Sequence, residues 1–72
     1  MKIEQLQEKI GERIRQLRES KGISQQNLAA ICNFEKSNLS RIEAGRTNPT
    51  IFTLFKISQA LEVSIAELVD VD

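Results

Sequence analysis

Residues 24–45, SQQNLAAICNFEKSNLSRIEAG, constrain the fold of this 72-residue chain most strongly, because they encode two short helices with a tight turn between them. Ser24 can cap the first helix with its hydroxyl group. The apolar residues that follow recur at the three- and four-residue spacing of one helical face: Leu28, Ala29 and Cys32. Asn33 tolerates the left-handed backbone that ends a helix sharply. The pattern therefore predicts a helix over residues 25–31 and a turn at Asn33.

The second helix of this stretch has its own start, core and end signals. Phe34 is an apolar plug before it, and Glu35 is the expected N-cap, with a negative charge that is favourable at a helix N-terminus. Leu39 and Ile42 mark a buried stripe, and Gly45 ends the helix. The outer face carries small polar and cationic side chains: Lys36, Ser37, Asn38, Ser40 and Arg41.

Those five side chains suit the edges of DNA bases. Arg and Lys match guanine O6 and N7, Asn matches adenine N6 and N7, and Ser pairs with several base edges. A helix of this length also fits the major groove of duplex DNA. The outer face is therefore predicted to contact bases. The alternative interpretation is an ordinary solvated face of a small helical protein.

A longer amphipathic segment precedes this stretch and predicts a helix over residues 3–20. Its apolar residues are spaced by three or four: Ile3, Leu6, Ile10, Ile14 and Leu17. Lys21 and Gly22 end the helix, and Ile23 packs back before the next one begins.

Two more helices are expected after Gly45. Residues 46–50 have the composition of a loop, and Thr50 is placed to cap a fourth helix. That helix directs one face to the core: Ile51, Leu54, Ile57, Ser58 and Leu61. Ser64 and Glu67 form a capping box for a last helix that contributes Leu68 to the core. The fold class expected is all-α, a compact five-helix bundle in one domain over residues 1–72.

Charge is balanced over the whole chain but not along it. Ten Lys and Arg residues offset ten Asp and Glu residues, so the net charge is zero. Residues 13–46 contain seven cations and three anions, a net of +4, whereas residues 57–72 contain four anions and no cation. Such a molecule has one end that meets phosphates and one that repels them, which would orient it on a duplex. Random segregation in a short sequence is the alternative.

Several function classes lack support. The chain has no His, no Gly-rich phosphate loop and no cluster of metal ligands, and Cys32 is expected to pack in the core. We therefore expect no enzyme activity, no metal and no cofactor. A single Cys suits a reducing compartment, and neither a membrane span nor a signal peptide is apparent. The expected location is the cytoplasm, without membrane association.

Four segments carry a family resemblance that covers most of the chain: IRQLRESKGISQQNLA, SRIEAG, RTNPT and LFKISQALEVSIAEL. Together they resemble the lambda repressor and Cro type of helix-turn-helix family of transcriptional regulators, also called the xenobiotic-response-element family. The chain departs from the family at Asn33, where relatives often have Gly, and at Glu35, where Ser or Thr is commoner. Both residues are physically admissible at these positions.

The resemblance implies further contacts. Relatives pair an Arg of the first helix with a Glu near the end of the base-contacting helix, which implies an ion pair of Arg18 with Glu43. That pair would hold Arg18 close to a DNA phosphate, and the alternative is two unrelated surface charges. Relatives also bind phosphates through the following loop, which implies contacts by Arg46, Thr47 and Asn48, unless the loop is a plain connector. Gln25, at the N-terminus of the preceding helix, is expected to contact phosphate as well.

Apolar residues near the C-terminus exceed what one stripe per helix can bury in so small a domain. The residues predicted to lie between two subunits are Phe52, Ile65, Val69 and Val71. Relatives tend to have a polar residue at the position of Phe52. Alternatively, Phe55 and Ile65 fill the core of the monomer.

The residues and the resemblance together predict a sequence-specific regulator of transcription that binds double-stranded DNA. Relatives of this size imply a repressor that binds a palindromic operator as a homodimer. Two alternatives are an antitoxin whose main partner is a protein toxin, and an interaction module that uses the helix-turn-helix shape without DNA. The sequence does not choose among phage repressors, restriction-modification controllers and antitoxins.

Overall fold

Five helices follow one another in the predicted order, and no strand is present. The computed structural model describes all 72 residues, Met1–Asp72. The helices are α1 (Ile3–Ser20), α2 (Gln25–Cys32), α3 (Lys36–Glu43), α4 (Ile51–Leu61) and α5 (Ile65–Leu68). The predicted all-α, five-helix fold is therefore confirmed. None of these helices is both long enough and apolar enough to span a membrane.

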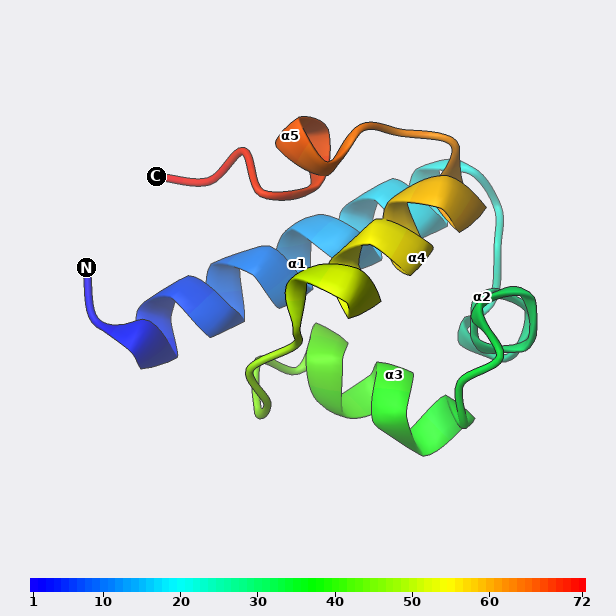
Figure 1. Ribbon diagram of the computed structural model, residues 1–72, viewed down its shortest axis with the longest axis horizontal. Coiled ribbons are helices and arrows are strands. Elements are labelled where there is room, and N and C mark those ends of the chain that lie inside the picture. The colour runs from blue at the N-terminus through cyan, green and yellow to red at the C-terminus, as the bar shows by residue number, and fades with distance from the viewer.

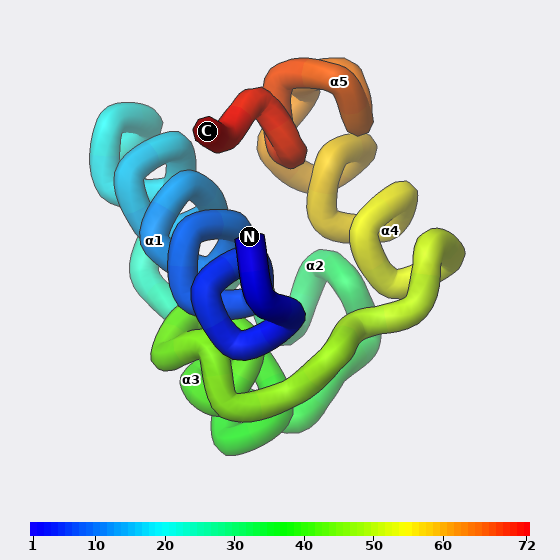
Figure 2. Tube along the Cα trace, turned by 90° about the vertical axis from the view of Figure 1, so that its left-hand side faces the viewer, coloured from blue at the N-terminus to red at the C-terminus, as the bar shows by residue number.

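The five helices pack around a single core. Figure 1 shows α1 as the longest helix, with α3 on one side of the molecule and α5 on the other. Figure 2 shows α1 and α4 facing each other across the molecule, with α5 above and α3 below, and Figure 1 shows α2 at one end of the molecule. α1 contacts α3 and α5, while α2 contacts α3 and α4. The helix with the predicted base-contacting face is thus far from the acidic C-terminal segment.

The core is one cluster of ten buried apolar residues: Ile14, Leu28, Ala29, Cys32, Leu39, Ile42, Leu54, Ile57, Leu61 and Leu68. The sequence predicts all ten, nine of them from helical periodicity and Leu68 from its place in the helix that the capping box begins. Helical periodicity is wrong for Ile3 and Ile51, which are 48% and 73% exposed. Both are the first residues of their helices, and the N-terminal end of α1 extends beyond its neighbours (Figure 1). An apolar stripe is buried only where another element covers it, which periodicity does not indicate.

The N-caps follow the predictions with one exception. Ser24, Thr50 and Ser64 each accept a hydrogen bond from the backbone N–H three residues later, at 3.0, 3.1 and 3.1 Å. Glu67 completes the capping box by accepting from the Ser64 N–H at 3.1 Å. Glu35 occupies the N-cap position of α3, but its side chain accepts no capping hydrogen bond. Its contribution is therefore limited to the charge near the helix N-terminus.

Two helices end on a left-handed residue that is not glycine. Asn33, after α2, has φ 60° and ψ 39°, as predicted, and the next N–H, of Phe34, donates to Ala29 O at 2.8 Å. Glu62, after α4, has φ 58° and ψ 42°. This second case is not expected from the sequence, because Glu lacks the short side chain that makes Asn tolerant of this conformation.

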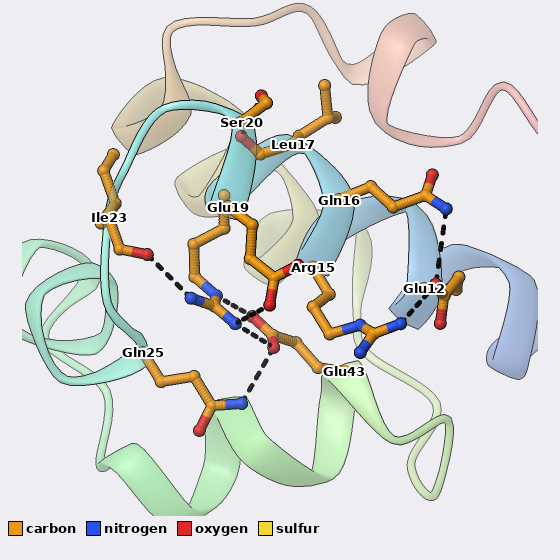
Figure 3. Close-up of polar contacts among 10 residues, drawn as sticks. Glu12, Arg15, Gln16, Leu17, Glu19, Ser20, Ile23, Gln25 and Glu43 are labelled. Carbon is orange, nitrogen blue, oxygen red and sulfur yellow. Dashed lines mark hydrogen bonds and ion pairs between the residues drawn. The ribbon is translucent and has the colours of Figure 1, made fainter.

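A buried ion pair joins α1 to the end of α3 (Figure 3). Arg18 donates through Nε to Glu43 Oε2 at 2.7 Å and through a terminal nitrogen to Glu43 Oε1 at 3.0 Å. Its other terminal nitrogen donates to the carbonyl of Ile23 at 2.7 Å. Gln25, the first residue of α2, donates to Glu43 Oε1 at 2.9 Å. One carboxylate therefore binds both neighbouring helices.

The ion pair is shielded from water, and this burial determines how much stability is lost when one of the two residues is removed. Arg18 and Glu43 are 8% and 7% exposed. The hydrogen bond to Glu43 raises the pKa of Arg18 above its ordinary value, so the guanidinium is charged at every accessible pH. Removing one member leaves a buried charge without its partner, which destabilises a fold far more than losing an exposed pair does.

The left-handed backbone at Glu62 predicts a stabilising substitution. Glu62→Gly should raise the free energy of unfolding by about 0.5 to 1 kcal/mol, because glycine adopts positive φ without the steric cost that other residues pay. The measurement is urea unfolding followed by circular dichroism. Glu62→Ala is the matched control, since it removes the same charge and keeps the strain. Equal effects of both substitutions would attribute the change to the lost carboxylate.

Because the Arg18–Glu43 pair is buried, we expect a glutamate of α3 and a glutamate of α1 to contribute very differently to the free energy of unfolding. Glu43→Ala should lower the free energy of unfolding by about 3 kcal/mol, because it strands the Arg18 charge in the protein. Glu12→Ala, which removes the exposed partner of Arg15, should lower it by less than about 1 kcal/mol. Urea unfolding of both variants tests the difference, and similar losses would contradict the importance assigned to burial.

Candidate nucleic-acid interface

The outer face of α3 presents all five side chains that are predicted to contact bases. Lys36, Ser37, Asn38, Ser40 and Arg41 are exposed, and α3 lies at the edge of the molecule opposite α5 in both views (Figures 1 and 2). Eight residues of α-helix measure about 12 Å, close to the width of the major groove of B-DNA. Nothing in the protein covers this face, so a duplex could approach it directly.

A polar hollow of about 240 Å³ lies beside that face, between α3, the following loop and the start of α4. Its lining is Phe34, Asn38, Arg41, Ile42, Thr47, Asn48, Pro49, Thr50 and Thr53. Two predicted base-contacting residues and two predicted phosphate-contacting residues therefore share one surface. Arg41 donates a hydrogen bond to the side-chain oxygen of Asn38, one turn before it on α3. The guanidinium and the amide are thus oriented together.

Arg18, for which a phosphate contact is predicted, is buried in the structure. Its N–H groups point inward to Glu43 and to the Ile23 carbonyl, and its side chain is only 9% exposed. All three donor nitrogens of the guanidinium are thus engaged within the protein, and the ion pair links Arg18 to the end of α3. The cause is the carboxylate of Glu43, which accepts the donors that a phosphate would need.

Gln25 is also engaged within the protein, through the hydrogen bond of its amide nitrogen to Glu43. No sequence pattern indicates this bond, because the two residues are 18 positions apart. The backbone N–H of Gln25 belongs to the first turn of α2, where amides have no acceptor within the helix. A phosphate contact at this position would therefore involve the backbone more readily than the side chain.

The cations of residues 13–46 differ in whether they form an ion pair with a carboxylate. Arg15 is 2.5 Å from Glu12, and this hydrogen bond raises the pKa of the guanidinium. Arg13 donates to the Glu67 carbonyl at 2.9 Å and so holds α5 against α1. Five cations of residues 13–46 have no carboxylate within ion-pair distance: Arg13, Lys21, Lys36, Arg41 and Arg46. The last three lie on α3 or shortly after it, where Lys36 and Arg41 are predicted to contact bases and Arg46 is predicted to contact phosphate.

The residues predicted to form a subunit interface differ in how much of each side chain is exposed. Val69 packs against the core, and Ile65 and Val71 are half-buried on α5 and the segment after it. Phe52 is 68% exposed and lies on α4, with its ring centroid 6.4 Å from that of Phe55. The sequence does not indicate this division, because helical periodicity alone cannot show which apolar residues another element covers.

Phe52 shares a hollow with residues of α2 and α4, here called the α2–α4 apolar surface: Ile31, Cys32, Phe52, Phe55, Lys56, Gln59 and Ala60. Ile31 is 62% exposed and Phe55 is 42% exposed. The Lys56 ammonium lies 5.8 Å from the Phe52 ring centroid and 4.9 Å from that of Phe34. Three large apolar side chains thus meet solvent at one place, which is typical of a site where another molecule binds.

Cys32 is a packing residue, as predicted. It is buried, and its thiol donates a long hydrogen bond of 3.6 Å to the Lys56 carbonyl. Burial raises the pKa of the thiol, so it stays protonated at neutral pH. No group of three or more His, Cys, Asp or Glu side chains is placed to hold a metal ion.

Comparison with known proteins identifies the family. The model of the HTH_3 helix-turn-helix family matches residues 14–68. The chain is 43% identical over 60 residues to y4dJ of Sinorhizobium fredii, described as an uncharacterized HTH-type transcriptional regulator, covering 83% of this chain and 78% of that protein. It is 47% identical over 62 residues to the HTH-type transcriptional regulator SinR of Bacillus subtilis, covering 85% of this chain and 56% of SinR. The chain therefore spans only about half the length of SinR.

Solved structures agree in fold. The restriction-modification controller protein C.AhdI from Aeromonas hydrophila matches with a TM-score of 0.83 and 34% identity, covering 85% of this chain and 92% of that one. SinR in complex with DNA matches with a TM-score of 0.79 and 47% identity, covering 85% of this chain and 98% of that one. This chain therefore belongs to the lambda repressor and Cro type of helix-turn-helix family of transcriptional regulators, as its sequence predicts.

Proposed function

We propose that this protein regulates transcription by binding a specific sequence of double-stranded DNA, and that it does so as a repressor in the cytoplasm. The observation that carries the proposal is the exposed polar face of α3, continuous with the polar hollow that Asn38, Arg41, Thr47 and Asn48 line. Family membership supports it. SinR was solved in complex with DNA, and the immunity repressor of Bacillus phage phi105 is 33% identical to this chain over 60 residues.

In this proposal α3 enters the major groove and its side chains divide two tasks. Asn38 and Arg41, held together by their hydrogen bond, contact base edges, where Arg suits guanine and Asn suits adenine. Lys36, Ser37 and Ser40 supply further base contacts along the same face. Arg46, Thr47 and Asn48 contact phosphates, which fixes the register of the protein on the duplex without selecting its sequence.

The two tasks predict different effects of removing an arginine from α3 and from the loop. Arg41→Ala should weaken binding to the preferred operator by about 1 to 3 kcal/mol and binding to random duplex much less, so that specificity decreases at particular base pairs. Arg46→Ala should weaken binding to both duplexes by similar factors and lower the salt slope by roughly one unit. Fluorescence anisotropy over a salt series, with an operator selected from a random library, measures both quantities.

A neutral substitution provides the control for this experiment. Gln25→Ala should change affinity for both duplexes by the same small factor and leave the salt slope nearly unchanged, because Gln25 carries no charge and its backbone N–H, the group placed for a phosphate, remains. If Arg41→Ala lost equal affinity for both duplexes while Arg46→Ala lost affinity only for operator, the proposed division of contacts would be wrong.

We also propose that the protein binds a palindromic operator as a homodimer. Half-sites of such operators lie about 34 Å apart, one turn of the duplex, and the chain measures 31 × 22 × 20 Å. Two copies side by side are therefore large enough for their α3 helices to reach successive major grooves. The α2–α4 apolar surface is the stronger candidate for the interface, because Phe52, Ile31 and Phe55 are exposed together.

If the α2–α4 apolar surface is the dimer interface, two aspartate substitutions should differ in their effect on dimerisation. Phe52→Asp should dissociate the dimer, because it places a charge in a contact between apolar side chains, and it should leave folding intact since Phe52 is exposed. Ile65→Asp, on α5, should leave the dimer in place. Sedimentation equilibrium at micromolar concentration measures both. A chain that is monomeric with and without DNA would exclude the homodimer, and loss of the dimer only in Ile65→Asp would move the interface to α5.

A protein partner is the second candidate function, because SinR was also solved in complex with the protein SinI, a structure that matches this chain with a TM-score of 0.80 and 47% identity. The match covers 85% of this chain and 60% of that one. A toxin would be such a partner if this protein is an antitoxin. Binding to random duplex at increasing salt separates the candidates, since a DNA-binding protein loses affinity steeply as salt rises.

A further inference from the structure

The middle of α1 contacts the C-terminal end of α3 backbone to backbone at Gly11. A Cβ atom built on Gly11 would lie 2.4 Å from the carbonyl oxygen of Ile42 and 2.6 Å from that of Glu43. Both neighbours are main-chain atoms, so no side chain can move aside to make room. Glycine is unfavourable inside a helix, yet at this position every other residue would need α1 and α3 to separate.

A second glycine makes the same contact from the side of α3. Gly45, which follows the helix with φ +74°, has room for no Cβ either, because that atom would lie 2.6 Å from the Cα of Glu8. Glu8 and Gly11 are three residues apart and therefore lie on one face of α1. Arg18, further along α1, binds Glu43 in the same end of α3. The last turn of α3 is thus held against α1 at three points.

We propose that Gly11 and Gly45 are positioning residues for DNA recognition, because the close contact that they permit sets how α3 is presented to the major groove. The inference rests on the function proposed above. Ordinary van der Waals contact begins at 3.4 Å, against 2.4 Å for a Cβ at Gly11, so a methyl group there displaces the end of α3 by an amount on the order of 1 Å. Arg41 and Asn38 lie on that short helix and move with it.

Base contacts and phosphate contacts respond differently to such a displacement. Hydrogen bonds to base edges weaken steeply when their distance and angle change. The attraction between cations and phosphates falls only gradually with distance, and exposed Lys and Arg side chains can adjust. A displaced α3 therefore loses sequence discrimination and keeps non-specific binding. A variant that is merely less stable binds both duplexes less in proportion to its folded fraction.

The chain offers a matched control in its third glycine. Gly22 has φ +69°, so alanine there is strained, but a Cβ would have nothing within 4 Å. Gly22→Ala therefore destabilises the fold through its own backbone without pushing on α3, whereas Gly11→Ala pushes on α3 without requiring positive φ. The two variants separate loss of stability from displacement of the helix.

The experiment measures operator and random-duplex affinity for the wild-type chain, Gly11→Ala, Gly45→Ala and Gly22→Ala, at a temperature where each is folded by circular dichroism. Gly11→Ala and Gly45→Ala should each lower the ratio of operator to random affinity roughly tenfold, the loss of about one bidentate base contact. Gly22→Ala should leave the ratio unchanged. Amide chemical shifts without DNA should change over α3 in Gly11→Ala and near Gly22 in the control.

Each other outcome has a defined meaning. Unchanged ratios in folded Gly11→Ala and Gly45→Ala would overturn the proposal, as would an equal loss in Gly22→Ala. Failure of both α3-contacting variants to fold, while Gly22→Ala folds, would also overturn it, because the contact would then serve folding itself. A wild-type chain that binds all duplexes equally would refute the proposed function instead, and the chemical shifts of α3 would still test the displacement.

Discussion

The ion pair between Arg18 and Glu43 is the interaction on which the arrangement of the first three helices depends. The Glu43 carboxylate, at the end of α3, accepts from Arg18 of α1 and from Gln25 of α2, and Arg18 also binds the Ile23 carbonyl in the connection between them. Since both charges are buried, neither is satisfied by water if the helices separate. The pair therefore constrains the mutual placement of the helices more than it adds net stability.

Much of the fold could be predicted because local chemistry and tertiary structure agree. Ser24, Thr50 and Ser64 begin helices, Asn33 ends one, and all ten core residues are among those predicted to be buried. The features that the sequence did not predict share one cause, because each depends on neighbours that are distant along the chain. Ile51 is at the edge of the core, and the left-handed backbone at Glu62 is imposed by the path of the chain between α4 and α5.

The predicted DNA-contacting residues show that sequence patterns do not indicate contacts between residues distant along the chain. The exposed face of α3 follows from helical periodicity, but the engagement of Arg18 and Gln25 by Glu43 depends on residues distant in sequence. The apolar surplus was recognisable from composition, whereas its division between Phe52 on one surface and Val69 against the core was not. Residue type therefore predicted which groups could contact DNA, and the three-dimensional arrangement determined which of them are free to do so.

The few contacts that hold α5 bear on which part of the protein unfolds first. This helix has only four residues, too few to be stable alone, and it is held by Leu68 in the core and by the bond from Arg13 to the Glu67 carbonyl. That bond joins residues 54 positions apart, so its formation closes a long loop. We therefore expect α5 to detach at a smaller free energy than global unfolding, and its amide protons to exchange with solvent before those of α2 and α3.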